Sequence, residues 1–268
     1  MTRREMCARL PLAELSYAHF NALRTAAHED QAAIRRRVHA TIECLLDPTR
    51  PSNAYYNRAI GRFADSLSGP ALRSLPSGIV GLEVTPEQLT GELAEMLFEE
   101  TGFRPVDQLC YLGMAPAGGA PVACEVIRFG AEDVARFFDL LQLAGVEFPP
   151  EKRARKKGYY CNDRFRTHVA RTADGAVSGW ATMYVDSGIA FFGNSFTLPQ
   201  FRGTGVHSAL LASRLNDAAG MRLETAFTDV EHGSQSYRNC MRAGFRTVSV
   251  NTIWKRKASP CGRSPSSR

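Results

Sequence analysis

The stretch Thr197-Leu-Pro-Gln-Phe-Arg-Gly-Thr-Gly-Val206 decides the fold of this 268-residue chain. The apolar run Ile189 to Phe196 precedes it and predicts a strand. Val206 to Ala219 follows it and predicts a helix, because its apolar residues recur on one helical face. A helix N-terminus offers unpaired N–H groups and a partial positive charge, which suit an anion. Gly203 and Gly205 lack a Cβ, so a phosphate can approach this turn closely.

The spacing of the two glycines narrows the choice of phosphate loop, although many short glycine motifs are only turns. A P-loop needs Lys and Ser or Thr after its last glycine, whereas Val206 and His207 follow Gly205. A dinucleotide loop needs a third small residue and an acidic residue after a second strand, and this chain does not supply them. The remaining pattern, Gln200-x-x-Gly203-x-Gly205, resembles the pyrophosphate loop of the GNAT acetyltransferase superfamily.

The segments after the loop resemble the same superfamily in their order. Residues 223–230 predict a strand, 234–243 a helix ended by Gly244-Phe245-Arg246, and 247–254 a last strand. The segment Gly233-Ser-Gln-Ser-Tyr-Arg-Asn239 looks like a Ser-x-Ser-x-Arg-Asn signature of a bacterial GNAT subgroup. The resemblance covers about residues 126–257. It implies the GNAT fold, an α/β (α+β) fold with a mixed twisted sheet flanked by helices.

The first half repeats part of this pattern. Thr85 as N-cap and Pro86 at the first position predict a helix to about Thr101. That helix ends at Gly102-Phe103-Arg104, and a strand over 106–112 follows. The repeated tripeptide predicts a tandem of two GNAT-like halves, of which the first is degenerate because it has no glycine loop.

The turn-rich segment 115–121 predicts a boundary between these halves, followed by a strand over 124–129 and a helix over 131–144. The predicted domains are therefore a degenerate GNAT-like half with leading helices (1–120), a GNAT acetyltransferase domain (121–257) and a disordered tail (258–268). Residues 3–43 predict an amphipathic helical region. Residues 53–61 form either a buried strand with internally bonded tyrosines or a strand that lines the acceptor pocket between the halves.

The composition fits a protein with a sizeable core, at 44% hydrophobic residues. The sequence contains no run of about 18 apolar residues, so no membrane span is predicted. No apolar segment follows the charged N-terminus as it would in a secretory signal. Seven widely spaced cysteines suit reduced thiols in the cytoplasm, and scattered histidines give no metal site. The net charge of +6 includes the runs 35–37 and 152–157, which predict solvated helix faces or attraction of an anionic ligand. Neither run has the interleaved aromatics of a nucleic-acid site.

The resemblance implies transfer of an acetyl group from acetyl-CoA to a primary amine of a small molecule, by direct attack. It also implies that the loop amides hold the pyrophosphate and that the strand-edge amides hold the pantetheine arm. The Leu198 amide is the expected donor to the thioester carbonyl. The cofactor-binding residues predicted in this way are Phe196, Thr197, Leu198, Arg202, Gly203, Thr204, Gly205, Val206, Ser236 and Asn239.

The catalytic groups depart from the family pattern. Many family members place a Glu on the strand before the loop, but residues 193–195 contain no carboxylate. Glu231 and His232 are the nearest ionisable candidates for a base, with a solvated loop as the alternative reading of each. Cys240 stands where the family usually has a Tyr that protonates the thiolate. Tyr237, one turn earlier, is either a substitute acid or a packing residue, and a thiolate with a pKa of about 8.5 can leave unaided.

Two other functions stay open at this stage. A non-catalytic acetyl-CoA-binding or sensing protein would explain the missing Tyr and Glu. A structural or nucleic-acid-associated protein would use the basic surface. The favoured prediction is a cytoplasmic N-acetyltransferase, a monomer or homodimer, that acts on a small-molecule amine and binds no metal, nucleic acid or membrane.

Overall fold

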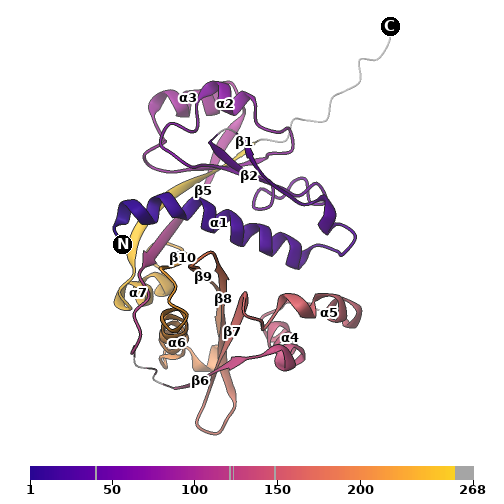
Figure 1. The fold of residues 1–268 in the computed structure, drawn as a ribbon, viewed down its shortest axis with the longest axis vertical. Coiled ribbons are helices and arrows are strands. Elements are labelled where there is room, and N and C mark those ends of the chain that lie inside the picture. The colour runs from indigo at the N-terminus through magenta and orange to yellow at the C-terminus, as the bar shows by residue number, and fades with distance from the viewer. Residues whose placement is uncertain (40, 121, 123, 148, 257–268) are drawn as a thin grey trace.

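The computed structural model describes residues 1–256 except 40, 121, 123 and 148, so the predicted disordered tail lies outside the described residues. Eleven strands in this part of the chain form one mixed sheet (Figure 1). In chain order they are β1 (Arg35–His39), β2 (Ile42–Leu46), β3 (Arg58–Gly61), β4 (Gly81–Val84), β5 (Phe103–Met114), β6 (Glu125–Phe129), β7 (Phe165–Arg171), β8 (Val177–Asp186), β9 (Ile189–Thr197), β10 (Thr225–Val230) and β11 (Arg246–Arg256). The order across the sheet is β1-β2-β3-β4-β11-β5-β10-β9-β8-β7-β6.

Seven α-helices and four short 3-10 segments accompany the sheet in the described residues. The α-helices are α1 (Arg3–Thr25), α2 (Gly69–Arg73), α3 (Gly91–Glu99), α4 (Val134–Leu143), α5 (Pro150–Lys156), α6 (Val206–Gly220) and α7 (Gln235–Arg242). The 3-10 segments are η1 (Gln31–Ala33), η2 (Ala131–Asp133), η3 (Lys157–Tyr159) and η4 (Pro199–Phe201).

The pairing pattern of the sheet repeats once. Strands β2 and β3 are antiparallel, β3 and β4 are parallel, and β4 is antiparallel to β11. In the second half β8 and β9 are antiparallel, β9 and β10 are parallel, and β10 is antiparallel to β5. Each half therefore pairs its parallel edge with the last strand of the other half, and the two exchanged strands β5 and β11 pair with each other at the centre. Figure 1 shows these two long strands running side by side between the halves.

The repeated tripeptide marks the same point in each half. Gly102 follows α3 with φ +70°, and Gly244 follows α7 with φ +101°. Each glycine allows the left-handed turn that ends the helix, and the Phe after it, Phe103 or Phe245, is fully buried. The structure thus confirms the tandem of two similar halves. Because β5 and β11 are exchanged, the proposed boundary near residue 120 divides the chain without dividing the sheet.

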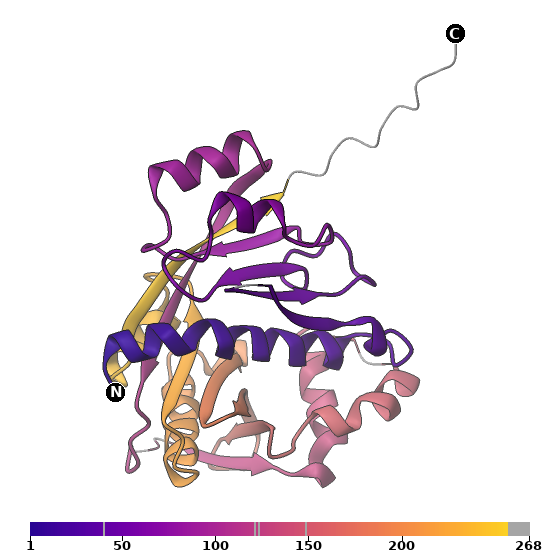
Figure 2. The same cartoon turned by 45° about the horizontal axis from the view of Figure 1, so that its top comes forward.

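Helix α1 lies between the two halves, as Figure 2 shows. Its side chains Leu10, Tyr17 and Phe20 join the core of the second half together with α4. On another side, Leu15 and Ala18 pack with strand residues of the first half. Helices α6 and α7 cover the opposite face of the second half. A helix that is apolar on two sides fastens both halves to one another.

Two helix predictions for the first half are wrong. The helical region predicted over 3–43 ends at Thr25, and residues 35–39 form β1, so the arginines 35–37 lie on a strand rather than on a helix face. The helix predicted from Thr85 begins only at Gly91, with Thr90 as its N-cap. The intervening turn is held by the buried Gln88, whose side chain accepts from the Thr85 N–H at 3.0 Å. Tertiary contacts override the local N-cap signal here.

Candidate functional site

The site begins where two parallel strands separate. Strands β9 and β10 pair from Ile189 opposite Thr225 to Phe192 opposite Thr228. Beyond that point β9 stays paired with β8 but leaves β10. A bulge causes this separation, since the register with β8 shifts after Ala181 and Asn194 adopts φ +40°.

Arg214 of α6 holds this bulge in place. Its guanidinium is buried and donates to Thr182 O and to Ser195 Oγ, both at 3.1 Å. Burial lowers the pKa of Arg214 to about 10, which leaves the side chain charged at neutral pH. The bulge is therefore held by a cation whose hydrogen bonds, among the described residues, go to neutral acceptors.

The strand edge presents different amides from those expected. The Leu198 N–H donates to Ser178 O of β8 at 3.0 Å, so it is directed away from the gap between the strands. N–H groups alternate in direction along a strand, and no register shift lies between Ser195 and Thr197. The amides of these two residues therefore face the gap. The Leu198 amide, expected to donate to a thioester carbonyl, has a partner in β8 in this structure.

The glycine loop has the geometry that the sequence predicts. Gly203 and Gly205 adopt φ +82° and +89°, and Gly205 is the residue before the first turn of α6. A Cβ built on either glycine meets no atom within 4 Å. The glycines are therefore required by the left-handed backbone, and the space in front of them is open for a ligand.

A cavity of about 460 Å³ lies over this loop. It brings together seven of the predicted cofactor-binding residues, namely Thr197, Arg202, Gly203, Gly205, Val206, Ser236 and Asn239. The other three lie elsewhere: Phe196 stacks on Trp180, the Leu198 amide bonds to β8, and the Thr204 hydroxyl donates to Phe201 O at 2.8 Å. Arg242 of α7 adds a second cation to the lining.

His207, in the first turn of α6, connects this cavity to a second one. The Asn239 side-chain amide donates to His207 Nδ1 at 3.1 Å, and Nε2 lies 3.4 Å from Ser236 Oγ. Burial lowers the pKa of His207 to about 4, so the ring is neutral at physiological pH. Both His207 and Ser236 line the two cavities, which therefore adjoin at the separated strands.

The second cavity, of about 520 Å³, lies beside the bulge and contains the carboxylate that the sequence analysis missed. Asp229, near the end of β10, is the one carboxylate among the described residues that line it. Its carboxyl is exposed to the cavity, yet the protein packed around it restricts its solvation, and this desolvation raises its pKa. A charged residue within the otherwise buried strand 225–230 was the available signal.

Helix α1 forms one wall of the second cavity. Tyr17, Asn21 and Arg24 recur on one helical face and line it together. The Tyr17 hydroxyl lies against Gly193, where a Cβ would collide with it, and accepts from Asn194 Nδ2 at 3.3 Å. Gly193 therefore lets α1 approach the bulge closely.

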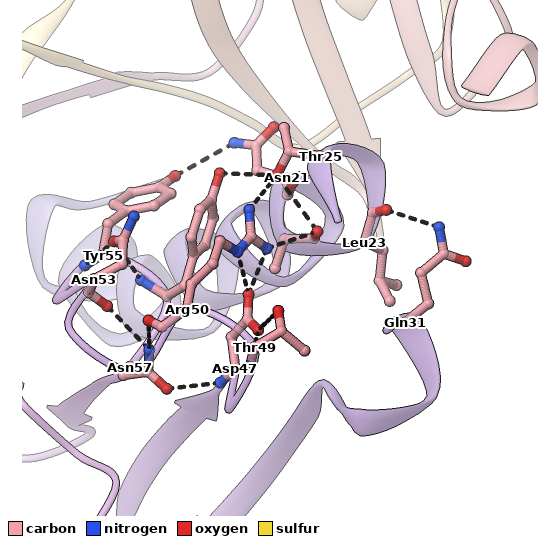
Figure 3. Close-up of polar contacts among 12 residues, drawn as sticks. Asn21, Leu23, Thr25, Gln31, Asp47, Thr49, Arg50, Asn53, Tyr55 and Asn57 are labelled. Atoms are coloured by element: carbon pink, nitrogen blue, oxygen red, sulfur yellow. Dashed lines mark hydrogen bonds and ion pairs between the residues drawn. The ribbon is translucent and has the colours of Figure 1, made fainter. Parts of the chain in front are cut away.

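Tyr55 and Tyr56 complete this wall from the first half. Only residues 58–61 of the predicted strand 53–61 are a strand, because Asn57 holds the preceding turn through bonds to Asp47 N (2.7 Å) and Arg50 O (2.8 Å). Figure 3 shows how this turn is fastened to α1.

Several hydrogen bonds make that attachment. Arg50 donates to Thr25 Oγ1 at 2.6 Å, and the Asn21 side chain donates to the Tyr55 hydroxyl at 3.3 Å (Figure 3). Both tyrosines line the second cavity.

The predicted acid and bases lie outside both cavities. Glu231 and His232 are exposed, and the His232 ring lies 4.9 Å from the Tyr237 ring. Tyr237 packs against the core beneath α6 and α7. Cys240, in contrast to these three residues, lines the second cavity, and burial raises the pKa of its thiol.

At the equivalent position of the first half, a side chain bridges the end of the strand pair, beside a cavity of about 620 Å³. There β3 and β4 are the parallel pair, and Gln88 lies at their ends. Its amide donates to Gly61 O (3.1 Å) and Phe63 O (2.8 Å). Gln88 thus binds two backbone carbonyls at and beyond the end of β3, the strand that corresponds to β9 in the repeated pairing pattern.

Comparison with solved structures identifies the fold. A GCN5-related N-acetyltransferase from Kribbella flavida matches with a TM-score of 0.60 at 15% identity, over 88% of this chain and 95% of that one. The corresponding protein from Sphaerobacter thermophilus gives 0.56 at 15% identity, over 92% of each chain. A tandem GNAT protein from the clavulanic acid biosynthesis pathway gives 0.51 at 15% identity, over 82% of this chain and 79% of that one. This chain therefore has the GNAT fold, in a tandem arrangement.

Sequence comparison adds no closer relationship, since no protein-family model and no curated protein matches the chain. No helix in the described residues is long and apolar enough to cross a bilayer. None of their His, Cys, Asp and Glu side chains gather in threes as a metal site requires.

Proposed function

We propose that this protein transfers an acetyl group from acetyl-CoA to the primary amine of a small molecule by direct attack. One observation carries the proposal: a cavity over the glycine loop meets a cavity with a carboxylate at the point where β9 and β10 separate. The GNAT fold, on which N-acetyltransferases occur among the similar structures, supports it.

The loop cavity fits the pyrophosphate and the pantetheine arm. Open space lies in front of Gly203 and Gly205, at the N-terminus of α6. Arg202 and Arg242 supply positive charge. In this proposal the Thr197 and Ser195 amides donate to the pantetheine arm and to the thioester carbonyl oxygen, where negative charge develops during attack.

Asp229 is the base that the geometry favours. The amine must lose a proton as its nitrogen bonds to the thioester carbon and the carbon–sulfur bond breaks. Asp229 takes that proton, and the thiolate leaves with the electron pair and takes a proton from water. The raised pKa of Asp229 makes it a better base than an ordinary carboxylate. Glu231, His232 and Tyr237 remain earlier candidates without support from the cavity geometry.

A second candidate function is a protein that binds acetyl-CoA without chemistry. It is favoured by Cys240, which lines the cavity at the helix position where the family usually has a tyrosine, and by Tyr237, which packs in the core. The cytoplasm is the compartment we propose in either case, supported by six described cysteines that are all free.

A thiol-release assay separates the two functions. Acetyl-CoA is mixed with the protein and a panel of amines, amino acids and aminoglycosides, and free CoA is measured. The proposed function predicts amine-dependent release of CoA. Binding of acetyl-CoA without release for any amine contradicts it and supports the second candidate.

A further inference from the structure

A third cavity adjoins the second one and has a different chemical character. It has a volume of about 220 Å³ and lies between α1, α4 and strands β7 and β8. Its lining includes the buried apolar side chains Phe137, Leu141, Phe165 and Trp180, with the cations Arg24 and Lys152 also on its wall. Its size and lining suit a branched aliphatic chain or a single aromatic ring.

Arg24 and Asn194 line both the second and the third cavity. A molecule bound with its amine at Asp229 can therefore place an apolar substituent in the third cavity and pass the Arg24 side chain on the way. Helix α1 supports this path, because Tyr17 touches the bulge and Arg24 lies two turns further along the same face.

The charge of the second cavity calls for an anionic group on the ligand. Its charged lining consists of Arg24, Arg214 and Asp229, while His207 is neutral. Arg214 donates four hydrogen bonds to oxygen atoms of α6 and of the strands at the bulge. The hydrogen bonds of Arg24 go to neutral atoms, Asn21 Oδ1 at 2.8 Å and Tyr160 Oη at 2.7 Å.

Arg24 keeps donors for a ligand. A guanidinium has five N–H groups. In the described residues, Arg24 donates three hydrogen bonds, two to Asn21 and one to Tyr160. A half-buried guanidinium with neutral protein partners is a natural site for a carboxylate, which it can bind by two parallel hydrogen bonds.

We propose that the acceptor is an amino acid with an apolar side chain, whose amine lies at Asp229, whose carboxylate binds Arg24 and whose side chain enters the third cavity. This inference rests on the proposed acetyl transfer. It names the acceptor class of the same site. Chemically, the product is the N-acetyl amino acid, formed with release of free CoA.

The test compares leucine and phenylalanine with the matched amines that lack only the carboxylate, 3-methylbutylamine and phenethylamine. Release of CoA is measured for each over a range of concentrations. The proposal predicts that kcat/KM is about tenfold to a hundredfold higher for the amino acid of each pair, the range expected for a charge-assisted contact. Equal or higher kcat/KM for the amines overturns it.

Variants locate the two recognition elements. Arg24→Gln should raise KM for leucine and phenylalanine and so reduce the preference over the matched amines. Arg128→Gln removes a surface guanidinium paired with Asp163 and should leave the preference as it is. Val146→Trp narrows the third cavity at its exposed rim and should shift the preference toward alanine. Acetyl-CoA affinity, measured by calorimetry, checks that each variant is folded.

The outcomes also separate this inference from the proposed function. Release of CoA with other amines, such as aminoglycosides, but not with amino acids overturns the acceptor class and leaves acetyl transfer standing. No release with any amine overturns both. A preference that Arg24→Gln and Arg128→Gln change equally also overturns the assignment of Arg24.

Discussion

At the scale of single residues, the site depends on side chains whose roles are set by position rather than by local sequence. Gly203 and Gly205 could be predicted, because two positive-φ residues before a helix need glycine and lie close together in the chain. Asp229, His207 and Arg24 could not, since each looks ordinary in its own segment. They gain a role only when α1, α6 and β10 meet around one pair of cavities.

Asp229→Asn tests the base. The variant should bind acetyl-CoA normally but lower kcat by about a hundredfold to ten-thousandfold, the range for general-base catalysis. Asp107→Asn, on an exposed part of β5, is the matched control and should retain wild-type kcat. Steady-state kinetics with the best amine of the panel measures both. A kcat for Asp229→Asn close to that of the wild type would remove Asp229 from the mechanism.

The pH profile gives an independent check on Asp229. The carboxylate must be ionised to accept a proton, so activity should fall as the pH drops through its pKa. Burial raises that pKa, so the fall should begin at a higher pH than for an ordinary aspartate. The acid limb of kcat/KM against pH measures it. An acid limb at the ordinary aspartate pKa, or none, would contradict the assigned environment.

Gly205→Val tests the loop. A branched residue at φ +89° is strained and projects into the space in front of the loop, so acetyl-CoA affinity should fall at least tenfold. Gly175→Val has a similar φ of +84° and similarly open surroundings in a distant turn. It should cost comparable strain but leave affinity unchanged. Calorimetric titration compares the two, and equal affinities would remove the loop from the cofactor site.

At the scale of elements, sequence patterns worked where they were uninterrupted. The segments predicted from 189 to 254 all form, as β9, α6, β10, α7 and β11. In the first half, the prediction of helix over 3–43 failed beyond Thr25. The run of arginines at 35–37 was read as a helix face, yet pairing with β2 makes it an edge strand. The start of α3 was also displaced, because Gln88 is taken up by long-range hydrogen bonds.

Gln88→Ala tests that explanation. The change leaves Gly61 O and the Thr85 N–H without their partner in a buried region, which should cost about 1–3 kcal/mol of unfolding free energy. Gln108→Ala, on an exposed part of β5, should change it by less than about 0.5 kcal/mol. Urea unfolding monitors both variants. Equal stability of the two would show that Gln88 does not hold the end of this strand pair.

At the scale of the whole molecule, the exchanged strands make the two halves one cooperative unit. The repeat of Gly-Phe-Arg predicted the duplication. It did not predict that β5 and β11 would each complete the sheet of the other half. Such pairing between distant segments leaves no local pattern. Helix α1 adds to the coupling, because it packs against both halves.

Tryptophan fluorescence tests this coupling. Trp180 packs in the core of the second half, and Trp254 of β11 packs in the core of the first. Variants Trp180→Phe and Trp254→Phe leave one reporter in each half. Circular dichroism of each variant follows its loss of secondary structure and so accounts for any change in stability. In each variant, the fluorescence transition should coincide with that loss. Separate transitions for the two reporters would mean that the halves unfold independently.

The central claim is that one half of this tandem protein holds acetyl-CoA at the separated strands, while the other half has no glycine loop and binds none. Calorimetric titration of the full chain with acetyl-CoA tests it most directly. The account predicts binding of one molecule per chain, with the affinity reduced in Gly205→Val and kept in Gly175→Val. Two equivalent sites per chain, or no binding of acetyl-CoA by the wild-type protein, would contradict it.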